Sequence, residues 1–220
     1  AKISEGIISL NATQKKELLA LYEQRGKAKK KVKFTPASGA ATRMFKGLFE
    51  YLSVVNQYEG KENEMPPLTD QVAHFSNHLS QFPFYETLKG GLLEKGIFEE
   101  APMEVIKELL QEKGLNYGQL PKGLIKFHAY PEGARTPVEE HLVEGCLYAA
   151  DDQGRVHIHF TISAHHRDTF DRHLKEVRGL YEKEYGKTLE ITFSEQKPST
   201  DTIAVDLKND PFRKDDGSLL

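Results

Sequence analysis

The sequence predicts an α/β fold with a largely parallel sheet and a helical insertion. Residues 155 to 196 alternate as strand, helix and strand, and the helix between the strands is about twenty residues long. A connection of this length between two strands implies a right-handed crossover and therefore a parallel pair. Residues 32 to 52 show an earlier strand–helix unit, which we expect in the same sheet.

The composition is that of a globular protein and excludes several classes of function. Hydrophobic residues make up 38% of the 220 residues, charged residues 29%, and the net charge is −3. This charge gives no general attraction to nucleic acid or to anionic membranes, and no run approaches the roughly 18 apolar residues of a membrane span. A single cysteine, Cys146, excludes an internal disulfide and indicates a reducing compartment. We therefore predict a cytoplasmic protein that binds neither nucleic acid nor membrane, and the oligomeric state stays open.

The first elements are predicted in order along the chain. Residues 1 to 30 form an N-terminal helical segment, in which Thr13 is expected to cap a helix that ends near Gln24. A short strand follows at Val32 to Thr35. A helical repeat of apolar residues then follows the small-residue loop, namely Met44, Leu48, Tyr51 and Leu52.

A helical insertion is expected at about residues 57 to 118. It begins with a polar loop ending in prolines, and its helical pattern is interrupted at Pro83, at Gly90–Gly91 and at Pro102. The rest of residues 31 to 220 is expected to form one domain around the sheet. The chain starts at Ala1 and ends on "DDGSLL", which looks like a turn into a further element, so we expect a piece of a longer protein.

The second half of the chain carries stronger local signals. Thr136 is expected to cap a helix to about Ala150, because Pro137 stands at its first position and Glu139 follows three residues after the cap. Strands are predicted at Val156 to Ile162 and at Leu189 to Ser194, and Gly186 closes the helix between them.

The stretch "PASGAATRM", residues 36 to 44, is the first candidate site. A strand, a tight loop and a helix N-terminus can bind phosphate, because the first N–H groups of the helix are unpaired and small residues allow close approach. Arg43 adds a permanent charge with a planar fork that suits phosphate. The alternative is a tight turn whose small residues only pack the helix against the sheet. The loop is neither a P-loop nor a dinucleotide fingerprint, because Gly39 is its only glycine and no Gly-Lys-Ser/Thr follows.

Three motifs resemble those of sugar nucleotidyltransferases. The loop resembles their signature A-x-G-x-G-T-R-M/L, except that Ala41 stands where a second glycine is usual. The stretch "LPKGLIKFHAYPEGARTPVEEHL" resembles their Pro-Lys segment through Pro121 and Lys122. The stretch "ITFSEQKPSTDTIAVD" resembles the segment whose glutamine faces a pyrimidine base, and Gln196 is the matching residue.

As a whole, the chain from about Gly6 to Leu220 resembles the uncharacterised domain-of-unknown-function family 4301. This resemblance implies a three-layer, Rossmann-like nucleotide-diphospho-sugar transferase fold. That family has no assigned activity, so the implied chemistry comes from the more distant resemblance to sugar nucleotidyltransferases: a nucleoside triphosphate, preferably a pyrimidine nucleotide, is joined to a sugar 1-phosphate and pyrophosphate is released. The implied catalytic residues are Arg43 and Lys122, and the implied nucleotide-binding residues are Ala37, Ser38, Gly39, Ala40, Ala41, Thr42 and Gln196.

The same resemblance implies Mg²⁺ as cofactor, with ligands outside this chain, so no metal ligand is assigned within it. Because the usual metal aspartate and much of the sugar site would lie beyond Leu220, we expect the 220-residue piece to be inactive by itself. Two alternatives stay open. One is a nucleotide-sugar-binding or glycosyltransferase-like protein on the same fold, and the other is a non-catalytic structural relic of the fold.

The histidines give a weaker signal. His157 and His159 alternate on one strand, without a carboxylate or cysteine at ligand spacing, so we interpret them as half-buried packing residues. His128 and His141 lie in or after the Pro-Lys segment, where they could line a cleft or lie on the surface.

Overall fold

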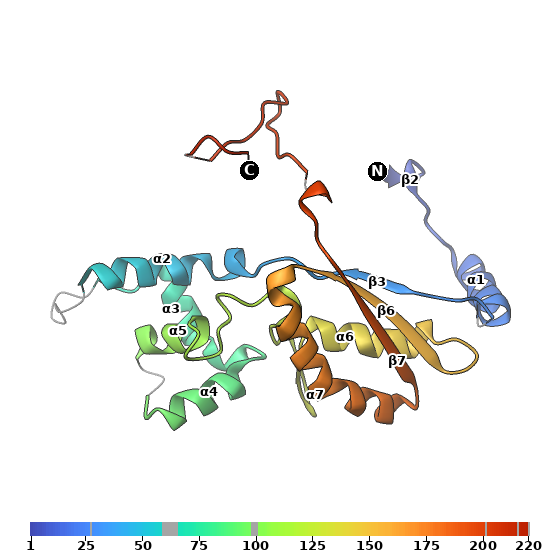
Figure 1. Ribbon diagram of the computed structural model, residues 1–220, viewed down its shortest axis with the longest axis horizontal. Helices are drawn as coiled ribbons and strands as arrows, with labels where there is room; N and C mark the ends of the chain where they lie inside the picture. The colour runs from blue at the N-terminus through green and yellow to red at the C-terminus, as the bar shows by residue number, and fades with distance from the viewer. Residues whose placement is uncertain (27, 59–65, 98–100, 201, 215, 220) are drawn as a thin grey trace.

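Two groups of elements make up the body of the protein. The computed structural model describes residues 1–26, 28–58, 66–97, 101–200, 202–214 and 216–219. Figure 1 shows a small sheet with two helices beneath it and, next to it, a group of shorter helices. The N-terminal helix and the C-terminal segment extend away from both groups.

The three predicted strands lie in one parallel sheet, as expected. They are β3 (Lys33–Pro36), β6 (Arg155–Ile162) and β7 (Thr188–Glu195), in the order β3-β6-β7. In this register Thr35 lies beside Phe160, and Phe160 lies beside Phe193. The protein is therefore a mixed α/β protein in which the central sheet is parallel.

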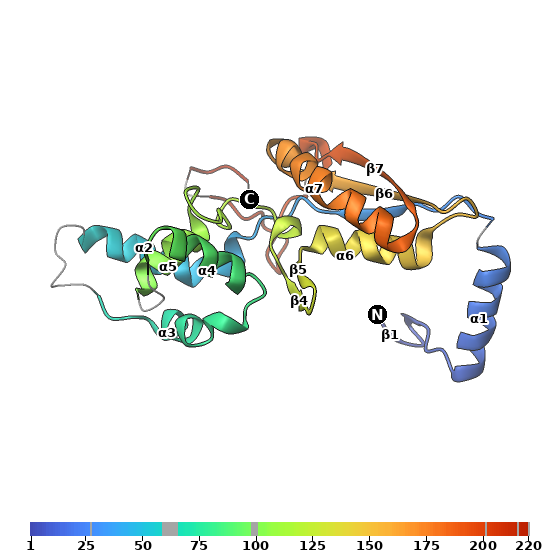
Figure 2. The same cartoon turned by 90° about the horizontal axis from the view of Figure 1, so that it is seen from below.

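One face of this sheet is buried under two helices. Helix α6 (Pro137–Glu144) and helix α7 (Arg167–Tyr185) both lie below the strands in Figure 1 and in front of them in Figure 2. Alternate residues of β6 point into this core, where Ile158 and Phe160 are fully buried. The histidines that alternate with them, His157 and His159, are half-buried, as expected.

The expected three-layer arrangement is wrong for the described residues. The opposite face of the sheet is not covered by a helix from this part of the chain, and Phe34 on that face is 63% exposed. Its ring stacks on His159, with 5.4 Å between centroids. The physical reason lies in helix α2 (Lys46–Val55), which follows β3 but packs its apolar face on the neighbouring helices and not on the sheet.

These helices form a second core of their own. Helix α2 buries Leu48, Leu52 and Val55 against α3 (Asp70–Asn77), α4 (Tyr85–Glu94) and α5 (Pro102–Leu110). Short helical turns complete the group, namely η1 (Thr42–Phe45), η2 (Asn56–Tyr58) and η4 (Leu79–Gln81). Part of the predicted insertion, residues 59–65 and 98–100, lies outside the described residues.

The expected interruption at Gly90–Gly91 is wrong, because both glycines lie inside α4. A Cβ on Gly91 would stand 2.6 Å from Oε1 of Glu108, so the missing side chain leaves room for that carboxylate. Glu108 in turn forms an ion pair with Lys95 just after α4. Here glycine serves the packing of two helices and does not end one.

The remaining elements connect or flank the two cores. Leu120 packs against both cores and lies just before η5 (Lys122–Leu124). A short antiparallel hairpin follows, and single helical turns continue α6 and precede α7. In chain order these are β4 (His128–Tyr130), β5 (Gly133–Arg135), the π-helical η6 (Gly145–Ala149) and η7 (Ala164–His166).

Local helix signals agree with the sequence in α6 and α7 and differ in α1. Thr136 and Glu139 form the predicted capping box of α6, and Gly186 ends α7 with a φ of 60°. Helix α1 (Ala12–Arg25) is capped by Asn11 and not by Thr13. The reason is a second capping box, in which Asn11 and Gln14 satisfy each other's backbone N–H groups.

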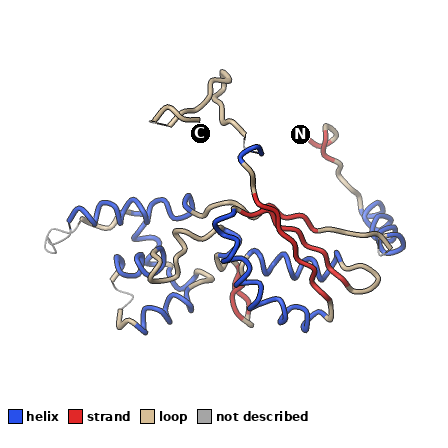
Figure 3. Tube along the Cα trace, viewed as in Figure 1, coloured by secondary structure: helices blue, strands red, loops and turns tan. Residues whose placement is uncertain are grey.

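Both terminal segments lie apart from the cores. Strands β1 (Lys2–Ile3) and β2 (Gly6–Ile7) pair with each other and with no strand of the central sheet in the described part of the chain, and α1 has no buried residue. The described residues after β7 are mostly loop and include the turn η8 (Pro198–Thr200), as Figure 3 shows. No helix in the described part of the chain is both long enough and apolar enough to cross a membrane.

The two capping boxes provide a matched pair of variants. Thr136→Ala should lower the free energy of unfolding by about 1–2 kcal/mol, because it removes a helix cap whose hydroxyl also contacts Glu139 and His173. Asn11→Ala should leave the main denaturant transition unchanged, because α1 buries nothing. Urea unfolding followed by circular dichroism measures both. An equal shift for the two variants would contradict the separation of α1 from the cores.

Candidate functional site

The first loop and the Pro-Lys segment lie side by side although they are far apart in the sequence. The backbone N–H of Lys122 donates a hydrogen bond of 2.9 Å to the carbonyl of Gly39. Ala40 and Pro121 form an isolated antiparallel bridge next to it. The two stretches are therefore joined at the carboxyl end of β3, which is the edge at which open parallel sheets bind ligands.

A pocket of about 180 Å³ opens at this junction. It lies between the end of β3, the turn η5 and the first half of α6. Three of the predicted site residues line it, namely Ala37, Gly39 and Lys122. The other lining residues are Thr35, Pro36, Gly123, Pro137, Val138 and His141.

The rest of the predicted loop does not line this pocket. Ala41 is 1% exposed and belongs to the core of the helical group, so at this position the small residue serves packing. Thr42 and Arg43 are exposed on η1. The carbonyl of Ser38 accepts a hydrogen bond of 3.4 Å from the hydroxyl of Ser163, which ties the loop to the end of β6.

Gln196 lies at the same edge of the sheet but not in the pocket. It directly follows β7, and its N–H donates to the carbonyl of Ile162 at 2.8 Å. Because β6 lies between β3 and β7, two strand spacings, or roughly 10 Å, separate the end of β7 from the end of β3. A single ligand would have to span that distance to touch both Gln196 and the pocket.

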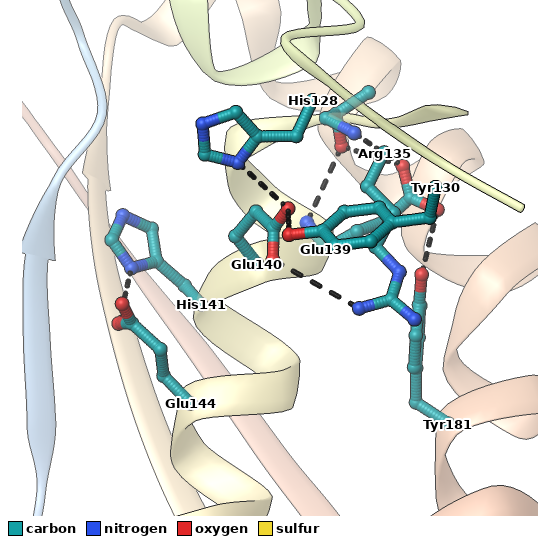
Figure 4. Close-up of polar contacts among 9 residues, drawn as sticks. His128, Tyr130, Arg135, Glu139, Glu140, His141, Glu144 and Tyr181 are labelled. Carbon is teal, nitrogen blue, oxygen red and sulfur yellow. Dashed lines mark hydrogen bonds and ion pairs between the residues drawn. The ribbon is translucent and has the colours of Figure 1, made fainter. Parts of the chain in front are cut away.

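His141 contributes the imidazole of the pocket lining, and a carboxylate orients it. Its Nδ1 lies 3.3 Å from Oε2 of Glu144, one helical turn further along α6. The same carboxylate accepts a hydrogen bond of 2.5 Å from Nζ of Lys33, which also donates to the hydroxyl of Tyr148 at 2.7 Å. Figure 4 shows His141 and Glu144 on the side of α6 that faces β3.

The pair of Lys33 and Glu144 is electrostatically matched. The hydrogen bond from Lys33 holds the pKa of the Glu144 carboxyl below its ordinary value, despite partial burial. Burial lowers the pKa of Lys33, but the bonds to Glu144 and Tyr148 outweigh it, so the pKa of Lys33 is raised. Both groups therefore carry their charges at neutral pH.

The other sides of α6 are held by two further carboxylates. Glu139 is buried and accepts hydrogen bonds from Thr136 and from the hydroxyl of Tyr181, at 2.8 and 3.0 Å. Burial, together with the Glu139 charge, raises the pKa of Tyr181 well above its ordinary range. Glu140 contacts the hairpin through His128 Nδ1 at 3.0 Å and the Tyr130 hydroxyl at 2.8 Å (Figure 4).

The pocket does not fit a metal ion held by protein ligands. None of its lining residues is a carboxylate, and Glu144, which contacts the lining residue His141, is already bonded to Lys33. Among the residues that the structure describes, no group of three or more His, Cys, Asp or Glu side chains could hold a metal. His157, which we expected to lack a carboxylate partner, in fact pairs with Glu190 of β7 at 2.9 Å.

His141 was not among the predicted site residues, although its position in a cleft was one of two alternatives. The spacing of three residues between His141 and Glu144 on a predicted helix was the available signal, because such residues lie side by side. Lys33 gave no such signal, because its contact with Glu144 joins two elements that are remote in the sequence.

The fold and this site define an α/β protein whose candidate binding pocket lies at the carboxyl edge of a parallel sheet. The chain belongs to the family described as Domain of unknown function (DUF4301), whose model matches residues 1–220. No curated protein and no solved structure matches the chain.

The charge of Glu144 should be visible in the pH dependence of stability. The pKa of Glu144 in the folded protein lies below the ordinary 4.5. The charged carboxylate therefore contributes to the free energy of unfolding above pH 4.5, and this contribution is lost as the pH falls through the pKa of the folded protein. Glu144→Gln should therefore lower the free energy of unfolding by about 1 kcal/mol at pH 7, since the pair is partly exposed. The difference from the wild type should shrink below pH 4.5.

Glu132→Gln, in the exposed hairpin turn, is the matched control and should change nothing at either pH. Urea titrations at pH 7 and pH 4 measure all three proteins. A pH-independent difference for Glu144→Gln would mean that the lost charge is not the cause.

Proposed function

We propose that the protein binds a phosphorylated nucleotide at the pocket of Gly39, Lys122 and His141. We further propose that it belongs to the class of sugar-1-phosphate nucleotidyltransferases. The observation that carries this proposal is the hydrogen bond between Lys122 and Gly39, because it brings together two motifs that resemble that class. A tight turn that served only to pack a helix would not need the second motif beside it.

The pocket offers the groups that a phosphate requires. Lys122 supplies a positive charge at its wall, and His141 supplies a ring nitrogen whose partner on the other side is Glu144. The N–H group of Gly39, which lines the pocket, donates to no acceptor in the described part of the chain. An oxyanion placed there would gain charge-assisted hydrogen bonds, which are about twice as strong as neutral ones.

The size of the pocket favours a role in binding the phosphate end of the ligand. Sites that enclose a whole small molecule usually measure about 300–1,000 Å³, and this one has about 180 Å³. The sugar or nucleoside would therefore lie outside, along the carboxyl edge of the sheet. A role of Gln196 in reading a pyrimidine base, and of Arg43 in holding the β- and γ-phosphates, belongs to this proposal.

In the proposed reaction, a phosphate oxygen of the sugar 1-phosphate attacks the α-phosphorus of the nucleoside triphosphate. A new P–O bond forms, the bond to the β-phosphate breaks, and pyrophosphate leaves. Lys122 would neutralise the charge that builds on the α-phosphate, and the loop would hold the reactants in line. Mg²⁺ normally assists such transfers, but the described residues do not fit it, so no step is assigned to it.

A second candidate is a protein that binds a nucleotide-sugar without transferring it. The pocket lining without a carboxylate favours this candidate, because it offers phosphate contacts but no oxygen ligands for a metal. Because we expect the 220-residue piece to be inactive by itself, the two are distinguished by testing the full-length protein for pyrophosphate release from UTP and glucose 1-phosphate with Mg²⁺. Release supports the transferase, and UDP-glucose binding without release supports the binding protein. If the full-length protein does neither, the result favours a structural role of the fold.

Lys122→Ala should weaken UTP binding about 10- to 100-fold, because the lost charge-assisted bond contributes about 1.5–3 kcal/mol. Lys175→Ala, which removes an exposed lysine of α7, should leave the affinity unchanged. Isothermal titration calorimetry measures both. Equal affinities for the two variants would exclude Lys122 from the site.

Gly39→Ala separates the role of the loop in binding from its role in folding. No atom lies within 4 Å of the place where a Cβ on Gly39 would stand, so the variant should melt like the wild type. Its UTP affinity should nevertheless fall at least tenfold if the backbone must approach a phosphate closely. Unchanged affinity would show that the loop does not contact the ligand.

A further inference from the structure

A second and larger pocket lies on the helical side of the junction. It measures about 370 Å³ and shares no lining residue with the pocket of Gly39 and Lys122. Its walls come from η1 and α2, from α3, from residues 82 to 84 and from residues 125 to 127. The volume lies within the range of sites that enclose small molecules.

The interior of this pocket is aromatic. Phe82 stacks on Phe84 with 5.1 Å between ring centroids, and Phe75 lies 5.4 Å from Phe82. Two large apolar side chains of the lining are exposed to solvent: Met44 is 45% exposed and Phe127 is 53% exposed. A ligand with an apolar body would cover them, which is the usual meaning of apolar side chains gathered around a cavity.

One permanent charge lines this pocket, and it is positive. Nζ of Lys126 donates a hydrogen bond of 2.6 Å to the hydroxyl of Thr87 and has no carboxylate within ion-pair distance in the described part of the chain. None of the lining residues is acidic. His74, the other titratable lining residue, is exposed and packs on His78.

We propose that this pocket binds an anionic amphiphile, specifically a medium-chain monocarboxylate. Its hydrocarbon chain would lie on the phenylalanine rings, and its carboxylate would meet Lys126. The apolar walls select the chain, and the unpaired positive charge selects a carboxylate over an alcohol or an amine. This site is separate from the proposed nucleotide pocket and does not depend on it.

A single reporter tests occupancy directly. The chain contains no tryptophan, so Phe127→Trp places one indole at the mouth of the pocket. Titration with octanoate and decanoate should give a saturable change in tryptophan emission. Two added methylenes should tighten binding about tenfold. Phe34→Trp, on the open face of the sheet, should show no saturable change.

The charge is tested in the Phe127→Trp background. Lys126→Gln keeps a donor for Thr87 and should weaken decanoate binding about tenfold, whereas decanol should bind equally to both proteins. Lys126→Arg should restore decanoate binding, and Lys175→Gln should leave it unchanged. Melting curves check that each variant is folded.

Three results would overturn the proposal. The first is the absence of saturable decanoate binding to the folded reporter protein. The second is equal affinity for decanoate and decanol, which would remove the role of charge. The third is a decanoate response in the Phe34→Trp protein equal to that at Phe127→Trp, which would indicate binding to exposed apolar surface in general.

Discussion

The hydrogen bond from the Lys122 amide to the Gly39 carbonyl is the contact on which the arrangement of the molecule depends. It ties the end of β3 to the segment that returns from the helical group, and Leu120 beside it packs into both cores. The paired segments, with the bridge between Ala40 and Pro121, therefore form the boundary between the sheet and the helical group. Both candidate pockets lie at this boundary, because segments 39–45 and 122–127 contribute to each of them.

Helix α6 is fixed by three carboxylates that contact three different elements. Glu139 reaches Tyr181 of α7, Glu140 reaches the hairpin, and Glu144 reaches Lys33 of β3. A helix of eight residues has little stability by itself, so these contacts and its apolar face must hold it. The position of His141 in the pocket follows from this anchoring. Polar contacts therefore serve here to place one side chain as well as to stabilise the fold.

Sequence reasoning succeeded where the signal was local and failed where it was long-range. The three strands, the cap at Thr136 and the left-handed Gly186 follow from periodicity and from short-range hydrogen bonds. The packing of α2 on the helical group could not be predicted in this way, because a helical pattern defines an apolar face but not the surface that this face covers. Ala41 shows the same limit within the site, because a small residue suits a phosphate loop and a tight core equally well. Lys33 could not be assigned to the site from the sequence, because its partner Glu144 is distant in the sequence.

The central claim is that the paired segments around Gly39 and Lys122 form one ligand-binding unit. Amide hydrogen exchange resolved by NMR, with and without UTP, tests it most directly. We expect the Lys122 amide to exchange slowly in the free protein, and UTP to shift the resonances of residues 37–43 and 121–126 together while α1 stays unchanged. Fast exchange of Lys122, or UTP shifts confined to other regions, would contradict the claim.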